Sequence, residues 1–466
     1  MLFNSIDFAI FLPIVFVLYW FVANRNLKSQ NLLIVLTSYL FYGWWDWRFL
    51  SLLFLSTIVD YSVGLGLSKY ENQRKRKILL AISVSVNLGL LMFFKYYNFF
   101  IDSFVDAFTF FGSEFNRSSL RIILPVGISF YTFQTMSYGI DVYKKELKPT
   151  KDFIAFMAFV TFFPQLVAGP IERASNLLPQ FYKKRIFDYP NASKGLKLML
   201  WGFFMKVVVA DRLSLYVDDV YGNIDLHTGP SLAMATLFFA VQIYCDFGGY
   251  SLIAIGCAKL FGFELMKNFN RPYLSSSFKE FWSRWHISLS TWFRDYLYIP
   301  LGGSKGNSRR TSKNLLITFI VSGFWHGANW TFIIWGALHG VYLIVENSLK
   351  NYRLPKIVLV LIVFLLTNLA WVFFRAPTVS DALKILDKIF TLSDSYIYIG
   401  DKGIFLFSIL SILIIFINDL IAEYKPELQL VYNKNLLVRY SAITFIIFYI
   451  IGFGIFDKSQ FIYFQF

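Results

Sequence analysis

The sequence predicts an all-α, polytopic integral membrane protein, and three observations lead to this prediction. Of the 466 residues, 56% are hydrophobic and only 16% are charged, and the mean hydropathy is +0.54. Apolar stretches recur along nearly the whole chain, and basic residues gather in the short segments between them. A water-soluble domain could not bury this much apolar surface in one core.

The apolar stretches follow one another with few polar interruptions. In chain order they are residues 8–23, 31–45, 49–66, 78–94, 122–140, 153–169, 198–209, 232–260, 315–345, 357–374, 404–421 and 437–453. A spanning helix needs about 20 apolar residues, so the shorter stretches and those interrupted by Gly, Pro or His predict broken or re-entrant helices that line a cavity. We expect about ten true spans in a single integral membrane domain, residues 1–466.

The net charge of +15 predicts membrane topology through its distribution along the chain. Arg25 and Lys28 follow the first stretch, KYENQRKRK (69–77) follows the third and KKELK (144–148) follows the fifth. If spans alternate in direction, these clusters share one face, which the positive-inside rule makes cytoplasmic. The N-terminus then lies outside, and the first stretch lacks the pattern of a cleaved signal peptide. We therefore expect contact with membrane lipids and no nucleic-acid binding.

Residues 267–313 form a more polar segment in which Trp, Phe and Tyr alternate with Arg, Lys and His. This pattern is typical of amphipathic helices at a membrane interface, and we expect the segment to lie there on the cytoplasmic side. Ser277 with Glu280 three residues later predicts a helix start with a capping box. PLGGSKGNS (300–308) predicts a flexible loop and lacks the spacing of a phosphate-binding P-loop.

The chain has only four histidines, and their positions are informative. His227 lies in a polar loop, whereas His286, His326 and His339 lie in or near apolar sequence, where an ionisable side chain is costly and a functional candidate. On one continuous helix His326 and His339 would lie roughly 20 Å apart, and the sequence has no HExxH or paired-Cys motif, so we expect no metal site. There is also no GxSxG nucleophile elbow that leads from a strand into a helix.

His326 is the strongest candidate for chemistry. A buried neutral imidazole can take a proton from a hydroxyl, which suits acyl transfer to an alcohol. Gly323 and Gly327 beside it leave room for a ligand or for another backbone. Three further residues are expected to line the same place: Trp325, Asn329 and Trp330. From the residues alone, a catalytic base and a hydrogen-bonded structural histidine are both open.

Two long motifs resemble the membrane-bound O-acyltransferase family, and specifically its alginate O-acetyltransferase-like bacterial branch. These motifs are RWHISLSTWFRDYLYIPLGGS (284–304) and FWHGANWTFIIWGALHG (324–340). Further stretches are similar to that branch: MLFNSIDFAIFLPIVF (1–16), LPVGISFYTFQTMSYGIDVY (124–143), FFPQLVAGPIER (162–173) and YCDFGGYSLIAIGCAKLFGF (244–263). The resemblance covers nearly the whole chain, with the motifs in the expected order.

The resemblance implies that helices enclose a funnel through the membrane and that two residues are catalytic. The essential histidine of the WHG element is His326, and the second polar position, in RWHxS, is His286. His339 matches a position common in the branch and is given a supporting role. The resemblance implies acetyl-CoA as acyl donor and no bound cofactor. Five basic residues would face the anionic CoA or anchor the polar segment: Lys279, Arg284, Arg294, Lys305 and Arg309.

The resemblance also implies a destination for the acetyl group. It would cross the bacterial inner membrane to an exported polysaccharide, such as an alginate-like exopolysaccharide, peptidoglycan or cellulose, directly or through a secreted or periplasmic acetyltransferase partner. Two alternatives stay open at this point. One is a D-alanyl transferase acting on teichoic acid. The other is a transporter for a polysaccharide or lipid-linked precursor, in which Asp60, Lys206 and Asp246 would be the polar pathway residues.

Overall fold

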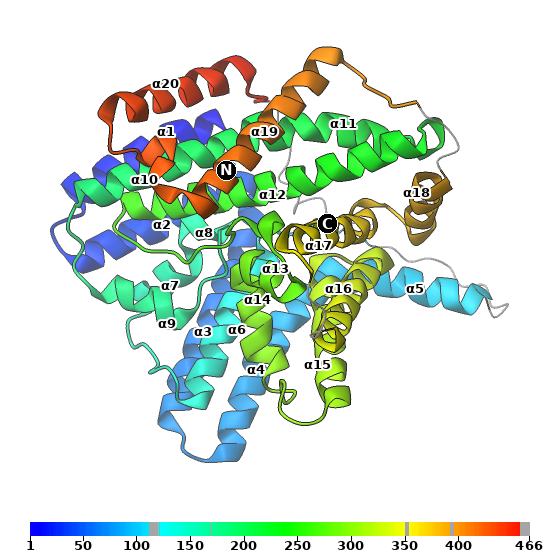
Figure 1. Cartoon of the computed structure of the whole chain (residues 1–466). Coiled ribbons are helices and arrows are strands. Elements are labelled where there is room, and N and C mark those ends of the chain that lie inside the picture. Colours follow the sequence, from blue (N-terminus) through cyan, green and yellow to red (C-terminus); the bar gives the residue numbers. More distant parts are fainter. Residues whose placement is uncertain (111–119, 121, 168, 350–353, 392–395, 457–466) are drawn as a thin grey trace. The chain divides into compact units, whose positions relative to one another are not determined.

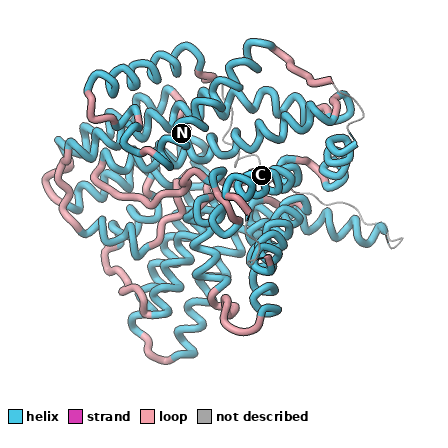
Figure 2. Tube along the Cα trace, viewed as in Figure 1, coloured by secondary structure: helices cyan, strands magenta, loops and turns pink. Residues whose placement is uncertain are grey.

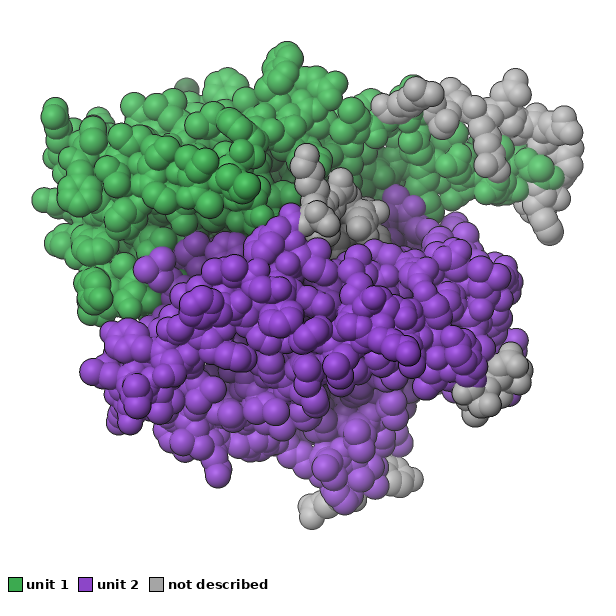
Figure 3. Space-filling model, turned by 90° about the horizontal axis from the view of Figure 1, so that it is seen from above, with its two compact units in different colours: residues 1–195, 257–266 green, residues 196–256, 267–466 purple. Residues whose placement is uncertain are grey.

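The computed structural model of the chain describes residues 1–110, 120, 122–167, 169–349, 354–391 and 396–456. In these residues every regular element is a helix, as Figures 1 and 2 show, so the predicted all-α fold is confirmed. The helices divide into two compact units, coloured in Figure 3. The first unit contains residues 1–195 and 257–266, and the second contains residues 196–256 and 267–466. A single domain stays a prediction.

Six helical segments of the described chain are long and apolar enough to cross a membrane, as a polytopic protein requires. They are Leu27–Lys69, Gln73–Thr109, Gly229–Leu260, Lys356–Arg375, Lys402–Tyr424 and Leu436–Phe453. Two shorter apolar helices, Ile6–Val22 and Phe153–Leu166, accompany them. The expected number of about ten spans stays a prediction.

In the first unit, α3, α4 and α6 pack against one another (Figure 1). Small residues permit this close packing, since a Cβ on Gly64 would lie 2.5 Å from the hydroxyl of Tyr138. The helix expected over 122–140 begins only at Ile128, because Gly127 before it adopts a left-handed conformation, φ 76°. The α-helices of this unit are α1 Ile6–Val17, α2 Leu27–Asp46, α3 Leu50–Lys69, α4 Gln73–Leu91, α5 Tyr97–Phe110, α6 Ile128–Lys144, α7 Phe153–Thr161, α8 Phe163–Leu166 and α9 Ala174–Leu177.

The second unit holds the candidate site. Two helices continue from one unit into the other: α10 Tyr189–Phe203 and α12 Gly229–Leu260. The remaining α-helices of the second unit are α11 Asp211–Gly222, α13 Phe278–Arg284, α14 Ile287–Phe293, α15 Ser308–His326, α16 Trp330–Ser348, α17 Lys356–Arg375, α18 Val379–Thr391, α19 Lys402–Tyr424 and α20 Leu436–Phe453. Large aromatic side chains fill its core, and Trp285, Trp335 and Trp371 are almost completely buried.

The apolar stretch 315–345 is a hairpin of two helices, which confirms the break expected there. Helix α15 ends because Gly327 is extended, and α16 begins where the side chain of Asn329 caps it. The two helices pack closely through Gly323 and Gly336, where a Cβ would lie 2.2 Å from a backbone carbonyl oxygen of the facing helix. The close approach expected at Gly323 is therefore made by a second backbone.

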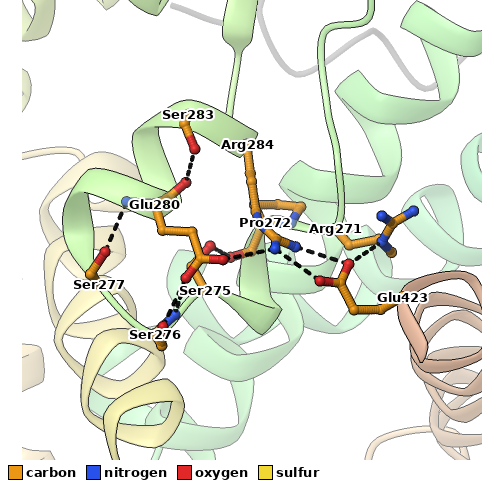
Figure 4. A network of polar contacts seen from close by, with 9 residues as sticks. All are labelled: Arg271, Pro272, Ser275, Ser276, Ser277, Glu280, Ser283, Arg284 and Glu423. Atoms are coloured by element: carbon orange, nitrogen blue, oxygen red, sulfur yellow. Dashed lines mark hydrogen bonds and ion pairs between the residues drawn. The ribbon is translucent and has the colours of Figure 1, made fainter. Parts of the chain in front are cut away.

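The helix start predicted at Ser277 is confirmed. Ser277 Oγ accepts a hydrogen bond from the backbone N–H of Glu280 at 3.0 Å. The Glu280 carboxylate reaches one residue further back than a capping box requires. It accepts from the backbone N–H and the hydroxyl of Ser276, at 2.7 and 2.9 Å (Figure 4).

Candidate functional site

The second unit brings His286 and His326 together. Their ring centroids lie 6.4 Å apart, with the ring planes at 61°. Both side chains are buried, with exposed fractions of 0% and 3%. His326 is the last residue of α15, and His286 directly precedes α14. Two histidines from separate motifs of the sequence therefore meet in one buried place.

The imidazole of His286 is oriented by Asn268. Its Nδ1 lies 3.1 Å from Asn268 Oδ1, which also accepts from the Ser288 hydroxyl at 2.8 Å. Asn268 Nδ2 donates to Ser251 at 3.1 Å, so Oδ1 is the acceptor in this network. This assignment gives the proton of the neutral ring to Nδ1 and leaves Nε2 as its basic nitrogen. Burial lowers the pKa of His286 to about 3, which keeps the ring neutral.

Aromatic rings surround His326. The centroids of Trp325 and Trp335 each lie 5.0 Å from its centroid, and that of Phe374 lies 5.4 Å away, all with the planes steeply inclined. Such walls keep water away and strengthen electrostatic interactions inside. Of the residues expected to line this place, Trp325 does so. Trp330 is 55% exposed, and Asn329 caps α16 and donates to a backbone carbonyl.

His339 belongs to the same group of aromatic side chains as His326. Trp335 separates it from His326, with centroids 5.0 Å from each imidazole. Phe281 stacks on it with planes at 3° and centroids 6.0 Å apart, and Trp282 meets it at 5.0 Å. Within the described part of the chain neither ring nitrogen of His339 has a hydrogen-bond partner. His339 therefore shares Trp335 as a neighbour with His326.

Metal-ligating side chains do not gather at this site. Among the residues the structure describes, no group of three or more His, Cys, Asp or Glu side chains could hold a metal ion. A structural zinc site would need four such ligands, and a catalytic one three.

The five basic residues considered for CoA fall into two groups. Arg284 pairs with Glu280 and Glu423, and Arg294 pairs with the adjacent Asp295, all at 2.6 to 2.9 Å. Their charges are balanced by these carboxylates. The other three are exposed: Lys279, Lys305 and Arg309.

The charged residues considered for a transport pathway are held by internal partners. Lys206 forms buried ion pairs with Asp211 at 2.7 Å and Asp246 at 2.5 Å in the second unit. Asp60 belongs to the first unit, where it accepts hydrogen bonds from Ser83 and Asn87. These partners account for the burial of the charges.

Sequence reasoning missed the residues that orient His286. Asn268 lies 18 positions before His286, and its partner Ser251 lies 17 positions before Asn268. No periodicity or motif connects these positions. The only signal was the loss of hydrophobicity after residue 266, which marks a polar segment without showing which amide faces the histidine.

Comparison with known proteins adds an independent finding. Residues 39–358 match the model of the membrane-bound O-acyltransferase family, a range that contains His286, His326 and His339. The chain is 42% identical to the probable alginate O-acetylase AlgI of Azotobacter vinelandii, over 84% of this chain and 79% of that protein. It is 37% identical to the peptidoglycan O-acetyltransferase of Helicobacter pylori, over 83% and 79%. A shorter match, 30% identical over 48% of this chain and 57% of the relative, is to the teichoic acid D-alanyltransferase of Streptococcus thermophilus.

Proposed function

This chain belongs to the membrane-bound O-acyltransferase family and is a membrane O-acyltransferase, and we propose that it transfers acetyl groups from acetyl-CoA to hydroxyls of an exported polysaccharide. The observation that carries the proposal is the buried pair of His286 and His326, whose ring centroids lie 6.4 Å apart among aromatic side chains. No resident cofactor is needed, because acetyl-CoA is the acyl donor.

His326 is the proposed general base. It takes the proton of the acceptor hydroxyl while the hydroxyl oxygen attacks the thioester carbonyl carbon. The carbon–sulfur bond then breaks, the CoA thiolate leaves, and it recovers the proton from the imidazolium. General-base assistance of this kind contributes typically about 10²- to 10⁴-fold in rate.

His286 has two conceivable roles, and its hydrogen bonds favour one of them. Polarising the thioester carbonyl would require a donated N–H. The Nδ1 proton is held by Asn268, and the remaining nitrogen of a neutral ring is an acceptor. We therefore assign His286 to orienting the acceptor hydroxyl: its Nε2 accepts the hydrogen bond of the O–H as the acceptor docks, and the O–H then turns to His326, which removes the proton.

The proposal places the protein in the bacterial inner membrane, with acetyl-CoA arriving from the cytoplasm. Lys279, Lys305 and Arg309 are three exposed cations of the polar segment on that route. The acceptor would be an alginate-like polymer, peptidoglycan or cellulose, reached directly or through a secreted or periplasmic acetyltransferase. Relatives named for alginate and peptidoglycan O-acetylation support the first two acceptors.

The test is acetyl-CoA turnover by the purified protein in proteoliposomes, followed by radiolabelled acetyl and free CoA. We expect His326→Ala to insert normally and to lose about 10²- to 10⁴-fold in turnover. Full turnover in that variant would remove His326 from the mechanism. No binding or turnover of acetyl-CoA by the wild-type protein, with candidate acceptors and partners present, would favour a transporter.

D-alanyl transfer to teichoic acid is the second candidate. It is supported by the match to the Streptococcus thermophilus enzyme, but that match covers 48% of this chain, against 84% for the alginate O-acetylase of Azotobacter vinelandii. Supplying a D-alanyl donor in place of acetyl-CoA in the same proteoliposomes separates the two reactions.

A further inference from the structure

Glu423, at the C-terminal end of α19, pairs with two arginines of the segment that carries His286 (Figure 4). Its Oε2 lies 2.7 Å from Arg271 Nε and 3.1 Å from Arg284 Nη1, and its Oε1 lies 2.9 Å from Arg284 Nη2. The two-point contact with Arg284 restricts the orientation of both groups. The Glu423 side chain is only 15% exposed, so water competes weakly for these bonds.

The two arginines lie on backbone segments that are hydrogen-bonded to each other. The Asn270 N–H donates to the carbonyl of Arg284 at 2.9 Å, and the Ile287 N–H donates to the carbonyl of Asn268 at 2.8 Å. Asn268 in turn holds the imidazole of His286 through Oδ1. A continuous series of contacts therefore runs from the Glu423 carboxylate to the His286 ring.

These same segments contain residues in an unfavourable backbone conformation. Among the described residues only three other than glycine have a positive φ, and two of them are Arg271, at 49°, and His286, at 41°. A residue with a Cβ remains in the left-handed region only where its surroundings hold it there. The ion pairs of Glu423 hold Arg271 directly. They act on His286 through the hydrogen-bonded backbone segments.

We propose that Glu423 is a positioning residue for His286, holding the Arg271 and Arg284 segments in register so that the imidazole faces His326. The inference rests on the proposed function for its kinetic consequences. It assigns a role to a residue of α19 that lies beyond the part of the chain matched by the family model, residues 39–358. Glu423 itself takes no part in the chemistry.

The kinetic test compares Glu423→Gln with Glu427→Gln, a control that removes an exposed carboxylate four residues away. We expect Glu423→Gln to lower kcat by about ten- to a hundredfold through misplacement of the imidazole, with KM for acetyl-CoA nearly unchanged. In a His286→Ala background the same change should have almost no further effect, because its target is gone. An equal loss in both backgrounds, or a loss confined to KM, would overturn the proposal.

Amide hydrogen exchange tests the positioning without relying on turnover. We expect exchange at Asn270, Ile287 and Ser288 to become at least about tenfold faster in Glu423→Gln and to stay unchanged in Glu427→Gln. If the wild-type protein turns over no acetyl-CoA, the proposed function fails while this measurement still decides the positioning role. Unchanged exchange would overturn that role. Should Glu423→Gln fail to fold, Arg271→Gln, which leaves the Glu423–Arg284 pair in place, takes its part in both measurements.

Discussion

Two buried polar groups, one in each unit, differ in the side chains that surround them. In the first unit, Asp60 accepts hydrogen bonds from Ser83 and Asn87, and Asn87 in turn accepts from Ser56 at 2.8 Å and Thr135 at 3.2 Å. Short polar side chains of neighbouring helices thus bond to one another in a closed network. Such networks join helices that have no hydrophobic drive to associate inside a bilayer.

The histidine group of the second unit is built from different neighbours. Trp325, Trp335 and Phe374 surround His326, and these rings offer few hydrogen-bond partners. His286 has an amide side-chain partner, Asn268. Burial alone therefore does not distinguish a candidate catalytic side chain from a polar side chain that holds helices together. The polar atoms of the first unit join neighbouring helices, whereas the imidazoles of the second unit lie within an aromatic wall, which suits the proton transfer that we propose.

The contrast can be tested by replacing one asparagine with leucine in each unit. The larger effect on turnover is expected at Asn268. Asn268→Leu removes the acceptor of the His286 Nδ1 proton and keeps a side chain that branches at Cγ. We expect kcat to fall by about ten- to a hundredfold, with KM for acetyl-CoA little changed. Steady-state turnover in proteoliposomes measures both. An unaltered kcat would show that the orientation of His286 is irrelevant.

The matched substitution in the first unit is Asn87→Leu. It leaves Asp60 Oδ2 and the hydroxyls of Ser56 and Thr135 without their present partner, which should cost about 1–3 kcal/mol of stability for each group that finds no other. Turnover per folded molecule should stay at the wild-type level. Thermal unfolding in detergent and turnover in proteoliposomes check the two parts. A selective loss of kcat here would make the Asp60 network part of the reaction.

The smallest effect is expected for His339→Phe. Since neither imidazole nitrogen of His339 has a hydrogen-bond partner within the described residues, a phenyl ring in the same aromatic surroundings should change stability by less than about 1 kcal/mol. It should also leave kcat close to the wild-type value, as a supporting role implies. Unfolding and turnover assays test this. Abolished turnover would place His339 in the chemistry beside His326.

Much of the fold followed from local sequence. Apolar stretches predicted the helices, Ser277 predicted the start of α13, and the Gly and His interruptions of the stretch 315–345 predicted a broken helix. Each of these signals depends on residues a few positions apart, within one helical turn or one cap. The membrane class, the family and the candidate histidines could also be predicted, because they too depend on composition or on short motifs.

The sequence by itself determined that His286 and His326 are candidates, but only the tertiary structure decided that they meet and what orients them. Asn268 lies 18 residues from His286, and Glu423 lies 139 residues from Arg284. No periodicity relates positions so far apart, because such contacts depend on how helices pack and on which backbone segments pair. Each candidate histidine could be recognised from the motif around it, whereas the contacts that position His286 form only after the chain has folded.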